Sequence, residues 1–377
     1  MTDNNENKVL NVPPLRFPEF SGEWEKCKFG DIATGFDYGM NAAAKPFDGE
    51  NKYIRITDID EASSTYNDTD IVSPDGSLTD NYVVNDRDIL LARTGASTGK
   101  SYLYRKSDGK LYYAGFLIRA NVTEHNPYFV FSQLHTHRYW RWVSIMSARS
   151  GQPGINSQEY SSFPIFTTSL HEENKIASLL SRLDERIATQ NKIIEKLQSL
   201  IKGIAQNIVL RNKPNVRISQ CLECCSSTLQ ESDVLEYGTY PVYGANGVVG
   251  FLDNYNTSNE AIYIIKDGSG VGAVSYVAGK CSATGTLNIL QAKKGFSLRY
   301  LYYLLNIFNF EPYKTGMAIP HIYFKDYGKA QIFCPSYSEQ LKYAKFLATI
   351  DDKLLTEQNV LINLSLQKQY LLRQMFI

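Results

Sequence analysis

Apolar residues recur every seven positions in two long segments of the chain. In the first segment one row contains Leu180, Ile187, Ile194, Ile201 and Ile208, and a second row contains Ile176, Leu183, Gln190, Leu197 and Ile204. In the second segment the rows contain Leu347, Leu354, Leu361, Lys368 and Met375, and Tyr343, Ile350, Glu357, Leu364 and Leu371. Rows that interleave at steps of three and four indicate the a/d seam of a coiled coil. At ~1.5 Å per residue, about 40 residues predict a helix of roughly 60 Å in each segment.

The second segment repeats the first at a constant offset in residue number. Ile155 matches Ile322 and Tyr160 matches Tyr327, without a gap between them. Further matched pairs are Ile165 and Ile332, Glu172 and Glu339, Lys175 and Lys342, Asp184 and Asp351, Thr189 and Thr356, and Leu197 and Leu364. Two copies of one long element are usually held in pseudo-symmetric positions, and their ligand is often bipartite as well.

We expect residues 172–211 and 339–377 to pair antiparallel with each other. The members of the rows from Leu180 to Ile204 and from Leu347 to Leu371, without Lys368, form the expected interface. Gln190 and Glu357 occupy the same heptad position near the middle of their helices, so they would share a polar layer that fixes register. Two alternatives stay open: each helix packs on its own domain, and the two polar residues coincide by chance.

The rest of the chain has the pattern of two β-rich domains. Strands are expected at 52–56, 88–92, 112–120, 261–265 and 272–278, and helices at 127–146 and 298–309. The expected organisation is an N-terminal tail at 1–20, a first domain at 21–170, a helix at 171–212, a second domain at 213–337 and a helix at 338–377. The predicted class is therefore α+β: two globular β-rich domains separated by two long helices that form an antiparallel coiled coil, with a pseudo-twofold repeat.

Length and composition indicate a multi-domain cytoplasmic protein. The chain has 377 residues, which is more than one core usually supports. No apolar run approaches 18 residues and no leader is recognisable, so neither a membrane span nor a signal peptide is expected. The formal net charge is +0, which disfavours nonspecific coating of nucleic acid but permits local basic faces. Cys221, Cys224 and Cys225 form a lone C-x-x-C cluster without a second pair, which indicates free thiols rather than a metal site.

A glycine-rich loop occurs at the same place in both β-rich domains. Residues 89–95 align with residues 262–268, and Gly99 and Gly272 follow at the same spacing. The first loop is one residue short of a phosphate-binding loop, and strand signals follow the second, so nucleotide binding is not expected at either. A strand, a glycine-rich turn and a second strand fit a loop that lies close to other backbone. No set of residues suited to catalysis or to metal binding is apparent, so the chain is not expected to be an enzyme.

The order of these motifs resembles the DNA-specificity (S) subunit of type I restriction-modification systems. The resemblance covers nearly the whole chain and rests on these segments: 15–20 with Trp24-Glu25, 151–156 with Pro164, 172–176, 183–187, 240–250, and Pro335 with Glu339-Gln340. One departure lies at 313–320, where Gly316 is displaced by two residues from the position of Gly151 in the first copy.

The resemblance implies a subunit without catalysis of its own. Each β-rich domain would read a short half-site of double-stranded DNA, and the paired helices would act as a spacer and as docking surfaces for two methyltransferase subunits. Those partners would bind S-adenosylmethionine and modify adenine, and restriction/translocase subunits would use ATP and Mg. The chain itself is expected to need no cofactor.

The loops supply the expected DNA-contacting residues. These are Arg93, Thr94, Ser97, Lys100 and Gln152 in the first domain and Asn246, Lys266, Ser269 and Lys325 in the second. The alternative interpretation of the loops is a pair of solvated hairpins. At the level of the whole chain, the alternatives are a coiled-coil scaffold that binds only protein and a DNA-modifying enzyme in its own right.

The two domains differ in sequence, so we expect an asymmetric target. Half-sites reached from one face of the duplex lie about 10–10.5 bp apart, centre to centre. If each domain reads about 3–4 bp, the unread gap is about 6–7 bp. Each half is expected to carry one adenine that can be methylated, on opposite strands.

Overall fold

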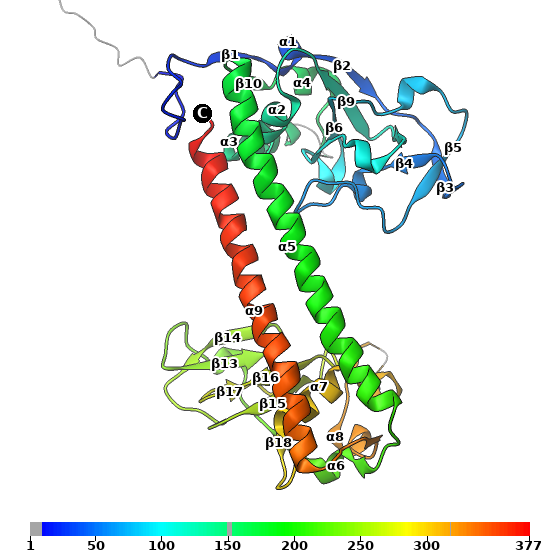
Figure 1. Ribbon diagram of the computed structural model, residues 1–377, viewed down its shortest axis with the longest axis vertical. Helices are drawn as coiled ribbons and strands as arrows, with labels where there is room; N and C mark the ends of the chain where they lie inside the picture. The colour runs from blue at the N-terminus through cyan, green and yellow to red at the C-terminus, as the bar shows by residue number, and fades with distance from the viewer. Residues whose placement is uncertain (1–9, 149–152, 317) are drawn as a thin grey trace, which may run out of the picture. The chain divides into compact units, whose positions relative to one another are not determined.

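The computed structural model describes residues 10–148, 153–316 and 318–377 (Figure 1). The chain divides into two compact units. Unit 1 contains Met1–Gln190 and Val360–Ile377, and unit 2 contains Asn191–Asn359. Each long helix therefore contributes one half to each unit. Within the described ranges, no helix is long and apolar enough to cross a membrane.

Unit 1 is built on a four-stranded antiparallel sheet with the strand order β2-β9-β6-β7. The bounds are β2 Ala33–Tyr38, β6 Asp88–Ala92, β7 Ser101–Leu103 and β9 Leu117–Val122. Smaller pairs join β1 Glu25–Lys28 to β10 Pro164–Thr167, β3 Ala43–Pro46 to β5 Val72–Asp75, and β4 Lys52–Ile54 to β8 Leu111–Tyr113. Every residue of β6 is buried because the strand is covered on both faces, which explains the apolar run that follows Asp88.

The expected strand at 112–120 is two strands in different sheets. β8 pairs parallel with β4, whereas β9 pairs with β2 and β6. Between them, the Gly115 N–H donates to the Met40 carbonyl at 2.8 Å and the Met40 N–H donates to the Tyr113 carbonyl at 2.8 Å. This backbone contact turns the chain, so the apolar run is continuous in sequence but not in structure.

The short helices of unit 1 cover the sheet near the N-terminal end of the first long helix. Their bounds are α1 Phe29–Ile32, α2 Pro127–Gln133, α3 His137–Ser147, α4 Ser157–Ser161 and α5 Leu170–Leu210. The expected helix at 127–146 is divided in two at Thr136. The hydroxyl of Thr136 donates to the Gln133 carbonyl at 2.8 Å and accepts from the Tyr139 N–H at 3.3 Å, so one side chain ends α2 and caps α3.

Unit 2 repeats the main features of unit 1 by itself. Its four-stranded sheet has the order β12-β18-β15-β16, and a β14-β13-β17 sheet and a β11-β19 pair accompany it. The strands are β11 Val216–Arg217, β12 Leu222–Ser226, β13 Tyr240–Gly244, β14 Gly247–Leu252, β15 Ala261–Ile265, β16 Val274–Val277, β17 Ser282–Ala283, β18 Leu287–Ala292 and β19 Gln331–Ile332. The helices are α6 Ile218–Cys221, α7 Leu298–Asn306, α8 Phe324–Tyr327 and α9 Tyr337–Gln374.

The two long helices pack together within each unit. In unit 1 the N-terminal half of α5 shares a buried core with the C-terminal half of α9, where Leu180 and Leu183 lie in one cluster with Leu364 and Leu371 (Figure 1). Lys368 Nζ also lies 2.6 Å from Asp184 Oδ1. In unit 2 the C-terminal half of α5 and the N-terminal half of α9 share another core, which contains Ile208. The pairing order is therefore antiparallel.

Each long helix is joined to a shorter helix from earlier in the chain, α5 to α2 and α9 to α7. Asn126 caps α2, and its N–H donates to the Glu173 carboxylate at 2.8 Å. In unit 2 Ser297 caps α7, and its N–H donates to Gln340 Oε1 at 2.9 Å. Eleven residues further along each long helix, the Tyr128 hydroxyl donates to Asp184, and the Tyr303 hydroxyl donates to Asp351 at 3.1 Å. The repeated positions of the sequence thus make matching contacts.

The segment before β1 lies against the ends of the long helices. Arg16 Nε donates to Glu172 at 2.7 Å, and the Leu15 N–H donates to the Gln374 carbonyl at 2.8 Å. The Arg16 guanidinium also helps to hold the pKa of the Glu172 carboxyl below its usual value, against the opposing effect of burial. The described part of this segment therefore docks on unit 1.

Candidate nucleic-acid interface

The first glycine-rich loop, loop 1 (residues 93–100), joins β6 to β7. The Gly99 N–H donates to the Ala92 carbonyl at 3.0 Å, and the Ala92 N–H donates to the Lys100 carbonyl at 2.8 Å. Gly99 has a φ of +93°, and a Cβ at this position would lie 2.8 Å from Val143 Cγ1. Glycine is required here because the backbone conformation is left-handed and α3 leaves no space for a side chain. The loop is therefore pressed against its neighbour, as the sequence predicted.

A second segment, residues 153–155, holds loop 1 through backbone hydrogen bonds. The Gly95 N–H donates to the Pro153 carbonyl at 3.1 Å, and the Ile155 N–H donates to the Arg93 carbonyl at 2.9 Å. We call this two-bond arrangement the clamp. It fixes the residues that follow β6, where Arg93 and Thr94 lie.

Unit 2 contains the same clamp on loop 2 (residues 266–272). The Gly268 N–H donates to the Pro320 carbonyl at 2.9 Å, and the Ile322 N–H donates to the Lys266 carbonyl at 2.9 Å. Pro320 and Ile322 are the residues that the sequence repeat matches to Pro153 and Ile155. The displaced Gly316 is not a partner in these bonds, so its shift leaves the clamp intact.

Arg93 presents a cation among aromatic side chains. Its guanidinium carbon lies 4.6 Å from the centre of the Tyr38 ring, and its backbone N–H donates to the Phe116 carbonyl at 3.0 Å. Tyr38 is 42% exposed and Phe116 is 58% exposed. A surface cavity of about 240 Å³ adjoins this group and is lined by Arg93, Thr94, Met146, Gly154, Ile155, Asn156 and Glu159. A cation, a hydroxyl and apolar groups at one surface are suited to base edges and phosphates.

The expected residues of unit 2 lie on neighbouring turns. The Lys266 N–H donates to the Thr286 carbonyl at 3.0 Å, and the Thr284 N–H donates to the Tyr243 carbonyl at 2.9 Å. Residues 284–286 therefore connect loop 2 to the end of β13, and Asn246 is exposed in the turn that follows this strand. Ser269 is exposed in loop 2, and Lys266 is half-buried.

The other residues that are expected to contact DNA each have different neighbours. Ser97 is half-buried in a one-turn helix of loop 1, and Lys100 lies 3.1 Å from Glu61. Lys325 is exposed on α8, with its ammonium 5.0 Å from the Tyr323 ring centre. Gln152 lies outside the described residues. The sequence did not single out Tyr38, at the end of β2, or Phe116, because the exposure of an aromatic residue in or next to a strand cannot be seen in the sequence.

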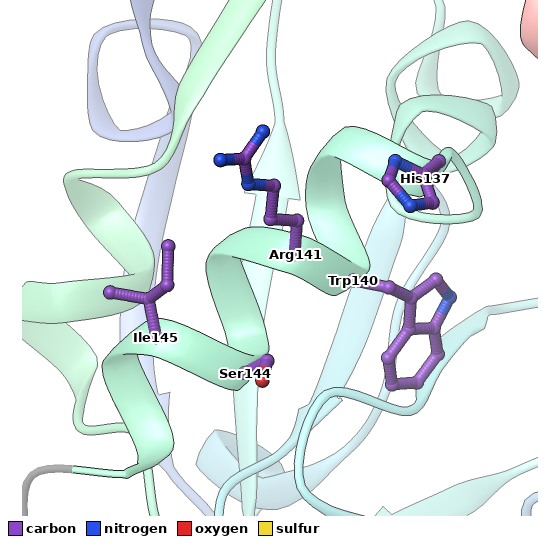
Figure 2. A pocket seen from close by; sticks show the side chains of 5 residues that line it. All are labelled: His137, Trp140, Arg141, Ser144 and Ile145. Carbon is purple, nitrogen blue, oxygen red and sulfur yellow. The ribbon is translucent and has the colours of Figure 1, made fainter.

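The exposed face of α3 borders loop 1. His137, Trp140, Arg141, Ser144 and Ile145 line a shallow cavity of about 680 Å³, and Figure 2 shows their side chains spread along the helix. A Cβ on Gly99 would lie 2.9 Å from the Trp140 ring, so the exposed face of α3 directly adjoins loop 1 at Gly99.

Two further features concern groups that metals bind. In the parts of the chain that the structure describes, no three His, Cys, Asp or Glu side chains form a metal-binding group. In unit 2 the buried sulfurs of Cys221 and Cys334 lie 3.9 Å apart.

The expected seam residues of the long helices are shielded from solvent to different degrees. Leu180, Leu183, Gln190, Ile194, Leu347, Leu364 and Leu371 are buried, and Ile187, Leu197, Ile201, Ile204, Ile350, Leu354, Glu357 and Leu361 are half-buried. Gln190 belongs to unit 1, whereas Glu357 belongs to unit 2 and pairs with Lys353. Their mutual contact stays a prediction.

A model of the "Type I restriction modification DNA specificity domain" family matches residues 21–199 and 215–364. The chain belongs to this family. Its identity as a type I specificity subunit, which is not itself an enzyme, is confirmed by that membership.

Solved structures of related systems confirm the fold. The S subunit of a type I restriction-modification system from M. genitalium is 18% identical, with a TM-score of 0.69 over 97% of this chain and 99% of that chain. A chain from a structure concerned with complex assembly and conformational transition of the type I R-M system is 15% identical, with a TM-score of 0.51 over 96% of this chain and 99% of that chain. Two β-rich domains with two long helices packed together are therefore the fold of the specificity subunit.

A curated relative matches a shorter part of the sequence. The specificity subunit of the Escherichia coli type I restriction enzyme EcoprrI is 25% identical over 126 residues. The aligned region is 33% of this chain and 30% of that relative, so the chain spans about three tenths of the relative's length in this match.

Proposed function

We propose that this specificity subunit reads a bipartite, asymmetric site in double-stranded DNA, with one half-site for each unit. The observation that carries the proposal is the clamp, which fixes a basic residue and a glycine-rich turn in the same way in both units. A fixed loop binds with a smaller loss of conformational entropy than a mobile one. The surroundings differ, because Arg93 lies beside Phe116 whereas Lys266 lies beside Thr286. Because the residues beside Arg93 and Lys266 differ, the two units are expected to read different half-sites.

The long helices also dock the other subunits of a restriction-modification complex. In unit 1 Ile362, Leu366 and Tyr370 follow one another at helical spacing on α9 and are 56%, 57% and 57% exposed. In unit 2 Ile193 and Leu200 of α5 lie one heptad apart and are 37% and 49% exposed. Apolar rows of this kind on the outer face of a helix pair favour contact with further helices.

We propose that each of these rows is the docking surface for one methyltransferase subunit, so that each unit binds one such subunit. This assembly forms in the cytoplasm. These subunits bring S-adenosylmethionine and methylate one adenine in each half-site. Restriction/translocase subunits join them and bring ATP and Mg. The solved chain whose title concerns complex assembly of a type I R-M system supports such an association by analogy of fold.

Methylation sequencing tests the proposal directly. A bacterial host without this system receives the chain together with its methyltransferase partner, and a matched host receives the partner alone. We expect a new methylated motif with two different half-sites, an unread gap of about 6–7 bp and modified adenines on opposite strands. A continuous or palindromic motif would contradict the bipartite reading. No motif, with the two proteins still associated, would favour a scaffold that binds only protein.

The loops are tested by neutralising one charge at a time. Arg93→Gln and Lys266→Gln are each expected to weaken binding about 5- to 150-fold, since a specific base contact contributes about 1–3 kcal/mol. Each variant should lose discrimination in its own half-site only. Lys106→Gln in unit 1 and Lys329→Gln in unit 2 are matched controls, because these side chains are 81% and 75% exposed. Unchanged binding by both loop variants would show that the DNA contacts lie elsewhere.

A further inference from the structure

Phe116 is a large apolar side chain held in the open by a tight turn. It lies between β8 and β9 and is 58% exposed. The Leu117 N–H donates to the Ala114 carbonyl at 2.8 Å, and the Gly115 N–H donates to the Met40 carbonyl at 2.8 Å. A Cβ on Gly39 would lie 2.2 Å from the Ala114 oxygen, so the two backbones are in close contact. The turn therefore has little freedom to withdraw the phenyl ring.

The same turn is bonded to the cation of loop 1. The Phe116 carbonyl accepts the Arg93 backbone N–H at 3.0 Å, and the Arg93 guanidinium donates to the Gly115 carbonyl at 3.5 Å. The guanidinium carbon of Arg93 also lies 4.6 Å from the centre of the Tyr38 ring. The backbones of Arg93 and Phe116 are therefore adjacent, and the two side chains form one surface. Arg93 contributes a hydrogen-bond donor to this surface, and Phe116 contributes an apolar ring.

From this pairing we infer that Phe116 contacts the 5-methyl group of a thymine next to the base that Arg93 reads. The inference rests on the proposed function. The major groove exposes only one apolar group on its base edges, the thymine methyl, and phenylalanine is among the side chains that contact it. Arginine most often binds the O6 and N7 atoms of guanine in that groove. The half-site of unit 1 therefore contains a thymine within one base-pair step of a guanine.

Unit 2 differs at the corresponding place. The Lys266 N–H donates to the Thr286 carbonyl at 3.0 Å, and the Thr286 hydroxyl lies 2.7 Å from that of Thr284. Phe116 is thus a feature of unit 1 alone. The half-site read by unit 2 provides an internal reference on the same DNA molecule.

Removal of single methyl groups from the DNA tests the contact. The full chain is purified with its methyltransferase partner, and the target is the motif found by methylation sequencing. Each thymine of the unit 1 half-site is replaced in turn by deoxyuridine, which lacks only the methyl group. We expect wild-type binding to weaken about 4-fold at one position, the effect of one apolar methyl group removed from a contact.

Protein variants identify the side chain that makes the contact. Phe116→Ala should bind thymine-containing DNA about 4-fold less tightly and should no longer distinguish thymine from deoxyuridine at that position. Phe116→Leu, which retains apolar surface, should still distinguish them. Responses to substitutions in the unit 2 half-site should be the same in all three proteins. Because Phe116 is exposed, these variants should fold normally, and tryptophan fluorescence of unit 1 checks this.

Several results would overturn the inference while leaving the proposed function intact. They are a half-site without thymine, a wild-type protein that is indifferent to every methyl group, and a Phe116→Ala variant that remains sensitive to the same one. A rise in 2-aminopurine fluorescence beside the thymine that disappears in Phe116→Ala would also overturn it, because it would show insertion between base pairs instead. Failure of the wild-type complex to bind any specific sequence would refute the proposed function itself.

Discussion

Two buried tyrosines hold Gly99 of loop 1, and they should differ in what their hydroxyls contribute to stability. The Tyr139 hydroxyl donates to the Gly99 carbonyl at 2.8 Å. The Tyr160 hydroxyl donates to the Ala92 carbonyl at 2.6 Å and accepts the Gly99 N–H at 3.2 Å. Burial raises the pKa of both side chains, so both hydroxyls are protonated at neutral pH. Replacement by phenylalanine removes each hydroxyl without changing the packing of the ring.

The loss of stability in each variant depends on which backbone atoms keep a hydrogen-bond partner. In Tyr160→Phe the Ala92 carbonyl and the Gly99 N–H remain bonded to each other at 3.0 Å, so only a normal hydrogen bond is lost, about 0.5–1.5 kcal/mol. In Tyr139→Phe the buried Gly99 carbonyl loses the hydroxyl that donates to it, which costs about 1–3 kcal/mol. Tyr139→Phe should therefore destabilise unit 1 more than Tyr160→Phe does.

Urea denaturation followed by tryptophan fluorescence measures the effect in the correct unit. The chain contains 3 tryptophans, and Trp24, Trp140 and Trp142 all belong to unit 1. Tyr370→Phe serves as the control, because this side chain is in the same unit and is 57% exposed. Equal losses of stability in the two buried variants, or a larger loss in Tyr160→Phe, would refute the reasoning about Gly99.

Other parts of the chain give further predictions. Leu364→Ala should lower the stability of unit 1 by about 2–5 kcal/mol in urea denaturation, since Leu364 is 7% exposed, whereas Leu366→Ala, at 57% exposure, should change it by less than about 0.5 kcal/mol; equal effects would contradict the assigned seam. Burial lowers the pKa of His135 to about 4. The unfolded chain takes up this proton near pH 6.5 and the folded chain does not, so stability falls as pH drops from about 6.5 towards 4. The loss reaches about 2 kcal/mol at pH 5, and His135→Gln should remove this part of the pH dependence. Deletion of one heptad from both α5 and α9 should change the gap of the methylated motif or abolish it; an unchanged gap would show that the helices do not set the spacing.

The long helices could be predicted from sequence because their pattern is local and periodic. Rows of apolar residues seven positions apart identify a helix pair without knowledge of any distant contact. The polar partners at their beginnings could not be predicted in this way. Glu173 is buried because it accepts the Asn126 N–H, and that bond joins residues nearly fifty positions apart. The side chain alone suggests an exposed first turn of a helix.

The interface was predictable only in part, for the same physical reason. The alignment of residues 89–95 with 262–268 identified the two loops, because glycine spacing reflects local backbone conformation. The clamp depends on backbone atoms about sixty residues away, and backbone hydrogen bonds place few demands on the side chains that flank them. Phe116 was hidden inside an apolar run that reads as one strand and is in fact divided by a turn.

The contacts of the long helices suggest that base reading and spacing are separate properties of the chain. Asp184 binds Tyr128 in unit 1, and Asp351 binds Tyr303 in unit 2, so in each unit a half of a long helix is tied to a shorter helix, α2 or α7, from earlier in the chain. Arg93 and Lys266, which are proposed to read bases, lie on the clamped loops instead, and Phe116 lies on the turn that is bonded to loop 1. A substitution in a loop then changes which bases are preferred and leaves the helices untouched. A change in helix length moves a whole unit and leaves its loop geometry as it was. We therefore expect half-site identity and gap length to vary independently in this protein.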